Sequence, residues 1–189
     1  MVISLMQFFN CIAQLDFYSR GLAKAKQKDY KSAIIEYDKA LELYPDKPEL
    51  YFSRAIAEYN SLENVGAILD YNKAIALNNS YFEAYIGRGN AKANMKNFEG
   101  AIDDYSKAIE LNPKSAEAYF YRGNIKNLQK DYKSAIFDFT KAIELNPQFT
   151  EAYTNRANAK YSIFDNIGAS ADWNKASRLL SNQINEEIK

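Results

Sequence analysis

The sequence contains no histidine and only one cysteine, Cys11, among its 189 residues. Without histidine, the usual metal sites and acid–base catalytic groups cannot be assembled, and a single cysteine excludes an internal disulfide bond. The sequence also offers no set of side chains that converges on a catalytic site. We therefore expect a protein that is not an enzyme and that binds no metal and no cofactor.

A net charge is lacking as well, because 24 Lys and Arg residues balance 24 Asp and Glu residues. No overall field would attract nucleic acid or an anionic membrane, so we expect neither as a partner. The apolar stretch Met1–Ala13 is too short to span a bilayer and has no Lys or Arg before it. We expect no membrane insertion and a cytoplasmic protein.

What the sequence does contain is a repeat of 34 residues, marked by the identical heptapeptides Lys107–Pro113 and Lys141–Pro147. We use the word column for the equivalent positions of successive repeats. One column is Arg20, Arg54, Arg88, Arg122 and Arg156, and another is Ala40, Ala74, Ala108, Ala142 and Ala176. A fixed period of this length indicates an array of stacked units in which each unit contacts its neighbours.

The period divides residues 15–183 into repeats at about 15–47, 48–81, 82–115, 116–149 and 150–183, followed by a polar tail at 184–189. Residues 1–14 are a degenerate N-terminal helix or a leader. As a helix they would cover the first repeat, which an array needs. As a signal, with Cys11 lipidated, they would make the protein exported or lipid-anchored, and a frayed tail is the third possibility.

Helical periodicity predicts two antiparallel helices in each repeat, and hence an all-α fold. Proline ends the second helix at Pro45, Pro113 and Pro147. Polar residues are expected as helix N-caps at Asp29, Asp131, Asn64 and Asn166, with a capping box at Ser80–Glu83. The segments Leu62–Gly66 and Phe164–Gly168 replace the usual turn and predict shifted turns in the second and fifth repeats.

Small and aromatic columns predict how the helices pack. The small column Gly21, Ala55, Gly89, Gly123 and Ala157 is expected to face Ala33, Ala67, Ala101, Ala135 and Ala169. The aromatic columns are Phe17, Tyr51, Tyr85, Tyr119 and Tyr153 on the first helices, and Tyr37, Tyr71, Tyr105, Phe139 and Trp173 on the second helices. Their periodicity indicates that these rings form the core.

The period, the order of small, aromatic and proline positions, and units of the form A-Y-x-x-R-G-N-x-K…A-I-x-D-[YF]-x-K-A-I-E-L-N-P resemble the tetratricopeptide repeat family. The resemblance covers most of the chain. It implies a right-handed α-solenoid of about five antiparallel helix hairpins. It also implies a non-catalytic scaffold or adaptor, whose first helices line a groove that binds peptide segments of partner proteins.

Two charged columns allow two interpretations. The arginine column could bind an acidic or phosphorylated ligand. Alternatively, each arginine could pair with a carboxylate 16 residues later, in its own hairpin, because a partly buried and unpaired arginine would be unfavourable. These partners are Glu36, Asp70, Asp104, Asp138 and Asp172.

The family resemblance places the groove on first-helix positions outside the packing columns. The expected groove residues are Tyr18, Phe52, Ile56, Ile86, Asn90, Phe120, Tyr121, Asn124, Asn127, Asn155, Asn158 and Tyr161. Asn90, Asn124 and Asn158 form a column that could hydrogen-bond a peptide backbone.

Some family members grip a peptide's terminal carboxylate with a lysine that this chain replaces by Ile86, Phe120 and Thr154, which disfavours such a ligand. We expect a protein or peptide partner in the groove. The alternative is a homotypic assembly module that self-associates through the ends of the array.

Overall fold

The structure, a computed structural model, describes residues 16–187 and the side chains of residues 16–184. The three interpretations of residues 1–14 concern a segment that lies outside the described residues.

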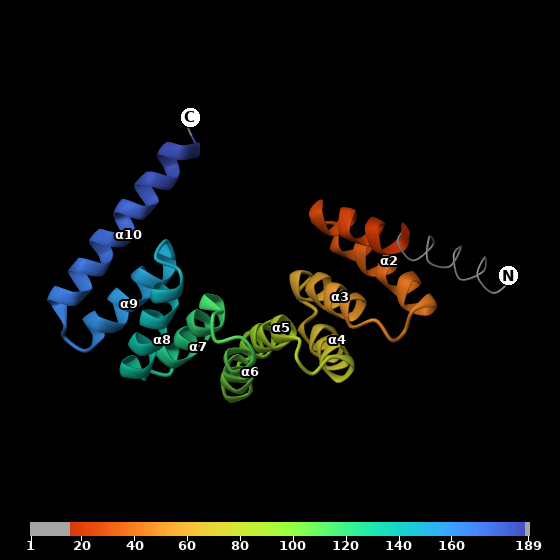
Figure 1. Cartoon of the computed structure of the whole chain (residues 1–189), viewed down its shortest axis with the longest axis horizontal. Coiled ribbons are helices and arrows are strands. Elements are labelled where there is room, and N and C mark those ends of the chain that lie inside the picture. Colours follow the sequence, from red (N-terminus) through yellow and green to blue (C-terminus); the bar gives the residue numbers. More distant parts are fainter. Residues whose placement is uncertain (1–15, 188–189) are drawn as a thin grey trace, which may run out of the picture. The chain divides into compact units, whose positions relative to one another are not determined.

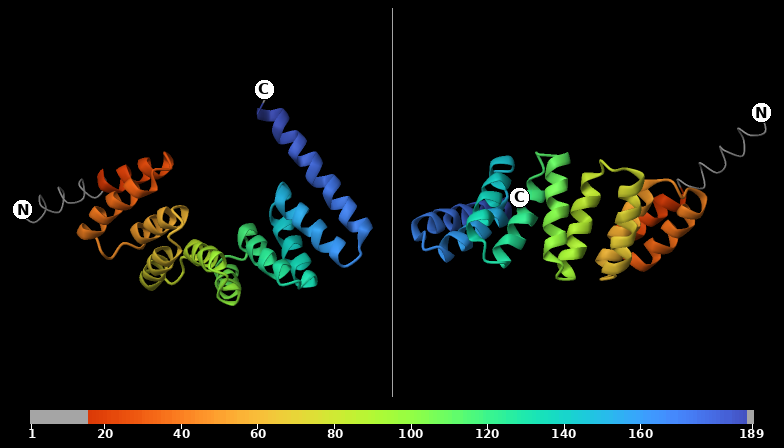
Figure 2. Two further views of the ribbon diagram at one scale, coloured as in Figure 1. Left: turned by 180° about the vertical axis from the view of Figure 1, so that it is seen from behind. Right: turned by 90° about the horizontal axis from the view of Figure 1, so that it is seen from below.

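Helices joined by short turns make up the described residues, which contain no strand (Figure 1). Residues 16–26 are helical and are followed by α2 (Tyr30–Leu43), α3 (Pro48–Asn60), α4 (Asn64–Leu77), α5 (Phe82–Asn94), α6 (Phe98–Leu111), α7 (Ala116–Leu128), α8 (Tyr132–Leu145), α9 (Thr150–Ser162) and α10 (Asn166–Glu187). Odd-numbered helices are the first helices of the predicted repeats, and even-numbered helices are the second. Within each of the two compact units described below, successive helices from α2 onward pack side by side (Figure 2), and the predicted all-α fold of helix hairpins is confirmed.

The chain divides into two compact units, one ending at Asn97 and the other beginning at Phe98. In the first unit, α3 packs against α2, α4 and α5. In the second unit, α7 packs against α6, α8 and α9, and α10 packs against α9. The boundary separates α5 from α6, the two helices of the repeat predicted at 82–115. Helix α10 is 22 residues long and runs on into the segment predicted as a polar tail.

The turn within each hairpin keeps the same register in every repeat. Its left-handed residue, with φ between 61° and 67°, is Lys28, Leu62, Lys96, Lys130 and Phe164 in successive repeats. The prediction of shifted turns in the second and fifth repeats is therefore wrong. Those two turns differ in composition, since large apolar residues stand where the others carry lysine, but not in backbone geometry.

This constant register also corrects the predicted N-caps. Asn64 and Asn166 are the first residues of α4 and α10, and the caps are the residues before them. Asp165 accepts a hydrogen bond from the backbone N–H three residues later at 2.9 Å, whereas Glu63 makes no such bond. The capping box at Ser80 is wrong as well, because α5 begins two residues after Ser80. The predicted caps Asp29 and Asp131 do accept backbone hydrogen bonds.

Rings of the second helices fill the core against the glycines of the first helices. Tyr37 and Phe139 are at most 1% exposed. A Cβ on Gly123 would lie 2.8 Å from the Phe139 ring, and one on Gly21 would overlap Tyr37. The nearest neighbours of these two glycines are therefore rings, and a side chain there would displace a ring. Trp173 of the same aromatic column is 39% exposed.

An arginine side chain joins three helices in the second unit. From α7, Arg122 donates two hydrogen bonds to the Asp138 carboxylate on α8, from Nε at 3.0 Å and from Nη2 at 2.7 Å. Its Nη1 donates to Ser106 Oγ on α6 at 3.0 Å. The planar guanidinium thus ties its own hairpin to the preceding helix.

The same arrangement recurs along the arginine column. Arg54 binds Asp70 and Asp38, Arg156 binds Asp172 and Thr140, Arg88 donates to Asn72, and Arg20 forms an ion pair with Glu36. Each guanidinium also lies 4.5 to 5.8 Å from the centroid of the ring three residues earlier, in Phe17, Tyr51, Tyr85, Tyr119 and Tyr153. The sequence interpretation missed the acceptors Asp38, Asn72, Ser106 and Thr140, which stand 16 residues before each arginine.

Lysine adds a second cation to two buried carboxylates of the second unit. Lys126 Nζ lies 2.7 Å from Asp138, and Lys160 Nζ lies 2.8 Å from Asp172. Asp138 is fully buried. Burial alone would raise the pKa of Asp172, but the hydrogen bonds from Arg156 and Lys160 outweigh it and lower that pKa. The Asp172 carboxylate is therefore held ionised by its two partners.

Glu58 reverses this charge in the second repeat. The column that holds Lys24, Lys92, Lys126 and Lys160 has a glutamate at position 58. Its carboxylate packs against Gly66, where a Cβ would lie 2.8 Å from Oε1. Its Oε2 is buried, and none of the described residues gives it a hydrogen bond. A buried acceptor of this kind destabilises the folded state.

The surroundings of Glu58 favour its protonated form. Burial raises the pKa of Glu58 to about 7, repulsion from Asp70, Glu63 and Asp38 adds to the rise, and Arg54 opposes it. Because the folded pKa exceeds the ordinary value of 4.5, proton binding stabilises the folded unit. That contribution is complete below the ordinary pKa and is lost as the pH rises through the folded pKa.

We expect Asp138→Ala to lower the free energy of unfolding by about 3 kcal/mol or more, because Arg122 and Lys126 would be left partly buried without their carboxylate. Urea denaturation followed by circular dichroism measures the change. The control is Glu144→Ala, which removes an exposed pair with Lys141 and should cost less than about 1 kcal/mol. Equal losses for the two variants would contradict the role of this ion pair.

We expect Glu58→Lys to stabilise the protein by about 1–2 kcal/mol at neutral pH, since a lysine there can reach Asp70 as Lys126 reaches Asp138. Glu58→Gln should remove the part of the pH dependence that lies between the ordinary and the folded pKa. Thermal melts between about pH 5 and pH 8 test both expectations. The wild-type chain should lose stability relative to Glu58→Gln as the pH rises, and parallel curves would contradict the assignment.

Candidate functional site

Polar and aromatic side chains of α7 and α9 share one face of the second unit. Phe120, Asn124 and Asn127 stand three or four residues apart on α7, and Asn158 and Tyr161 do so on α9. We call this set the α7–α9 face. The two helices pack against each other, and Asn155 Nδ2 donates to Asn124 Oδ1 at 2.8 Å across their contact. The predicted groove residues of this unit are thus brought together.

Aromatic rings support one side of this face. Phe120 is partly exposed, and its centroid lies 4.6 Å from Phe149 and 6.0 Å from the core residue Phe139. Tyr121 stacks on Tyr105 with centroids 5.9 Å apart. Phe120 therefore has a fixed position and still offers ring surface to a ligand.

The other side of the face ends in a cluster that includes a tryptophan. Tyr161 is 59% exposed, and its ring centroid lies 5.8 Å from that of Trp173 on α10. Trp173 Nε1 donates to Asn158 Oδ1 at 3.2 Å. The sequence interpretation placed Trp173 in the core because an aromatic ring recurs at this position in every repeat. Among the described helices, α10 packs against α9 alone, whereas α8 packs against both α7 and α9.

Asn127 carries a polar atom without a partner. Its Oδ1 is buried, and no hydrogen-bond donor among the described residues reaches it. Buried polar atoms are usually hydrogen-bonded, so this unpaired oxygen is unfavourable in the folded state, and its burial keeps it from a ligand.

The predicted groove residues of the first unit offer less surface to a ligand than those of the α7–α9 face. Tyr18 OH lies 3.2 Å from Ser53 Oγ, and the Phe52 centroid lies 4.7 Å from that of Tyr81. Ile56 is 38% exposed, whereas Ile86 is only 7% exposed and offers little surface to a ligand. Asn90 belongs to this unit, while Asn124 and Asn158 belong to the other.

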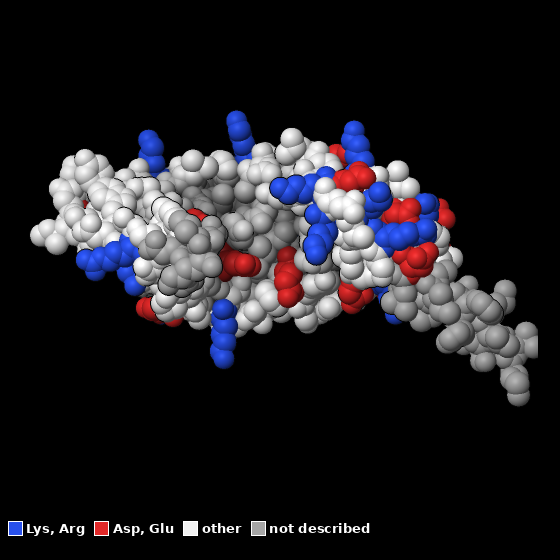
Figure 3. Space-filling model, turned by 90° about the horizontal axis from the view of Figure 1, so that it is seen from above, with Lys and Arg blue, Asp and Glu red and all other residues white. Residues whose placement is uncertain are grey.

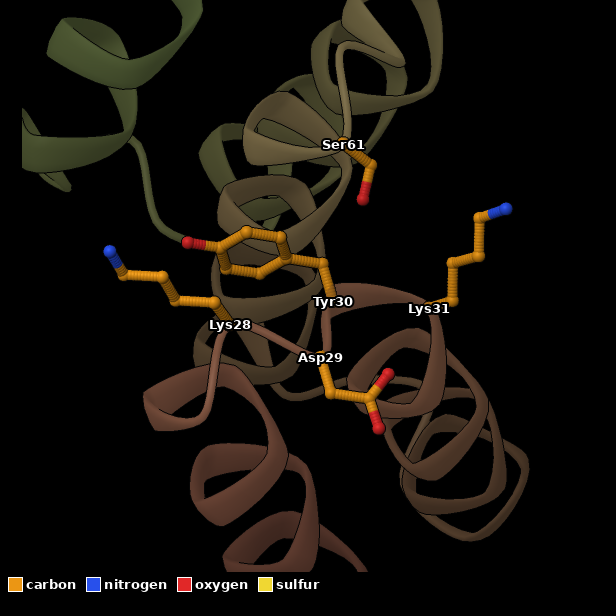
Figure 4. Close-up of a pocket in the computed structure, with 5 residues that line it drawn as sticks. All are labelled: Lys28, Asp29, Tyr30, Lys31 and Ser61. Carbon is orange, nitrogen blue, oxygen red and sulfur yellow. The ribbon is translucent and has the colours of Figure 1, made fainter.

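A hollow of about 310 Å³ lies at the turns of the first two hairpins, lined by Lys28, Asp29, Tyr30, Lys31 and Ser61 (Figure 4). The side chains of Lys28 and Lys31 point to opposite sides of it. Because no charged groups converge there, the hollow lacks the arrangement that a specific ligand site needs.

Charged side chains of both signs lie on the face of the molecule that Figure 3 shows. Within residues 16–187, no group of three potential metal ligands is placed to hold an ion. No helix of that part of the chain is long and apolar enough to cross a membrane.

Solved structures with the same fold span most of the chain. A crystal structure of MamA is 25% identical, with a TM-score of 0.80, and the match covers 87% of this chain and 96% of MamA. PilF of Pseudomonas aeruginosa is 19% identical, with a TM-score of 0.82, over 89% of this chain and 77% of PilF. The first repeat domain of Spaghetti (RPAP3), solved with the HSP90 peptide SRMEEVD, is 34% identical, with a TM-score of 0.60, over 61% of this chain and 92% of that domain.

No curated protein sequence matches the chain significantly. Family models described as tetratricopeptide repeat match residues 15–47, 82–115 and 116–149, which together make up more than half of the chain. With these matches, and with the helix hairpins that the same residues form, the chain belongs to the tetratricopeptide repeat family.

Proposed function

We propose that this chain is a non-catalytic protein-interaction scaffold that binds a segment of a partner protein on the α7–α9 face. The observation that carries the proposal is the pairing, on two adjacent helices, of ring surface at Phe120 and Tyr161 with amide groups at Asn124, Asn127 and Asn158. Apolar anchors combined with a few fixed polar groups are what a peptide site requires.

The chemistry of the face suits an extended peptide. An asparagine amide can donate to a backbone carbonyl and accept from a backbone N–H, and Asn124 and Asn158 present such amides on adjacent helices. Phe120 and Tyr161 would receive apolar side chains of the same peptide. The peptide in the RPAP3 domain supports a ligand of this kind, since that domain resembles part of this chain.

We expect Phe120→Ala combined with Asn124→Ala and Asn158→Ala to weaken partner capture at least tenfold, since aromatic anchors at interface centres carry much of the binding energy. The measurement is quantitative affinity capture from lysate of the source cells, with immobilised wild-type and variant chains. Circular dichroism and thermal melts verify that the variant folds.

The matched control combines three alanine substitutions on the outer side of α8, at Lys133, Phe137 and Lys141, and should leave capture unchanged. The proposal is wrong if the α7–α9 variant, correctly folded, retains the same partners as the wild type. Equal losses in both variants would also count against it, because the loss would not be specific to this face.

Self-association is a second candidate function, favoured by apolar residues on the last helix. Leu180 is 52% exposed and Ile184 is 48% exposed, one helical turn apart on α10. Against it, Ser170 and Ser177 stand where earlier second helices carry isoleucine or leucine against the following helix. That change gives the end of the array a polar surface, as terminal repeats require.

Homotypic assembly through α10 predicts a light-scattering mass that increases with concentration. Leu180→Gln combined with Ile184→Gln should then abolish the increase, because both exposed apolar contacts are removed. A mass that stays at that of the monomer at all concentrations would eliminate this candidate and leave the peptide scaffold unaffected.

A further inference from the structure

First helices carry a column of glutamates on the same side as the predicted groove residues. The column is Glu49, Glu83, Glu117 and Glu151, all exposed and all in the first turn of their helices. Glu117 precedes Phe120 by three residues and Asn124 by seven, so the three side chains lie along one side of α7. Glu151 stands in the same relation to Asn158 on α9.

These glutamates lack the cations that accompany glutamates on the second helices. Glu110 lies 2.8 Å from Lys107 Nζ, and Glu144 lies 2.8 Å from Lys141 Nζ. In the described part of the chain, no lysine or arginine forms an ion pair with Glu117 or Glu151. The carboxylates beside the α7–α9 face are therefore open to an external cation.

The lysine and arginine side chains of α7 and α9 are already bound to carboxylates of the second helices. Arg122 and Lys126 both bind Asp138, and Arg156 and Lys160 both bind Asp172. Releasing any of them toward Glu117 or Glu151 would leave a buried carboxylate with a lost partner. The negative charge of the face thus cannot be neutralised from within these helices at low free-energy cost.

Stabilisation of helix ends is the competing explanation for the column. An acidic side chain in the first turn interacts favourably with the helix macrodipole, by roughly 0.3–1 kcal/mol. That effect would appear in the free energy of unfolding and would not discriminate between ligands of different charge. Binding measurements with ligands that differ only in charge can therefore separate the two roles.

We propose that the α7–α9 face selects a cationic peptide segment, with lysine or arginine at Glu117 and Glu151 and an apolar side chain at Phe120 or Tyr161. The inference rests on the proposed peptide-binding function and adds the charge of the ligand. Complementary charge at the edge of an apolar contact area gives specificity and a salt-dependent association rate. The ligand has the opposite charge to the acidic peptide in the RPAP3 domain.

The test uses three fluorescent synthetic peptides that share one phenylalanine and one leucine and differ only in having lysine, glutamine or glutamate at the remaining positions. Fluorescence anisotropy measures their affinities for the full chain. At low ionic strength, we expect the lysine peptide to bind on the order of tenfold more tightly than the glutamine peptide, and the glutamate peptide to bind most weakly. Added salt should reduce these differences.

Glu117→Gln combined with Glu151→Gln should remove the preference for lysine. The matched control, Glu110→Gln combined with Glu144→Gln on the second helices, carries the same change of charge and should retain it. A preference that survives the first pair of substitutions, or that is lost equally in the control, would overturn the inference.

The outcome also separates this inference from the proposed function. If the three peptides bind equally well and Phe120→Ala weakens all of them, the charge selection is wrong and the peptide-binding face stands. If none of the peptides binds and partner capture is insensitive to Phe120, Asn124 and Asn158, both proposals are wrong.

Discussion

An arginine guanidinium that hydrogen-bonds two successive hairpins is the interaction on which this array depends. In Arg122, one edge of the guanidinium holds Asp138 of its own hairpin, and the remaining nitrogen holds Ser106 of the preceding helix. A planar fork with several donors can satisfy both at once, which an ammonium cannot do with the same geometry. The array is therefore linked by directional polar contacts as well as by its apolar core.

Residues that perform the same packing task in every repeat could be predicted from the sequence. The arginines, their carboxylates and the buried rings recur as one residue type or a close substitute, so the period itself identifies them. The acceptors at Asp38, Asn72, Ser106 and Thr140 could not be found in this way, because four residue types perform one task. The N-cap predictions at Asn64 and Asn166 were wrong for a related reason. Residue preference favoured Asn64, whereas the register places the cap at Glu63.

Two residues that differ from the rest of their columns have surroundings that the repeat pattern does not predict. Glu58 stands in a lysine column and leaves a buried oxygen without a hydrogen bond, and Trp173 stands in a buried column and is exposed. The first departure follows from a change of side chain, and the second from the end of the array. Neither could be evaluated from periodicity alone, since both depend on which neighbouring side chain is present or missing in three dimensions.

The charges that stabilise the hairpins and the charges of the α7–α9 face belong to different residues, so the charge of that face can vary without loss of the fold. The cations that the hairpins need are bound to Asp138 and Asp172, on the side of α7 and α9 that faces the second helices. Glu117 and Glu151 take no part in those contacts, so the proposed charge preference can be changed there while the linkage between hairpins stays intact. A repeat fold can thus hold one stable frame while its first-helix surface is adapted to partners of different charge.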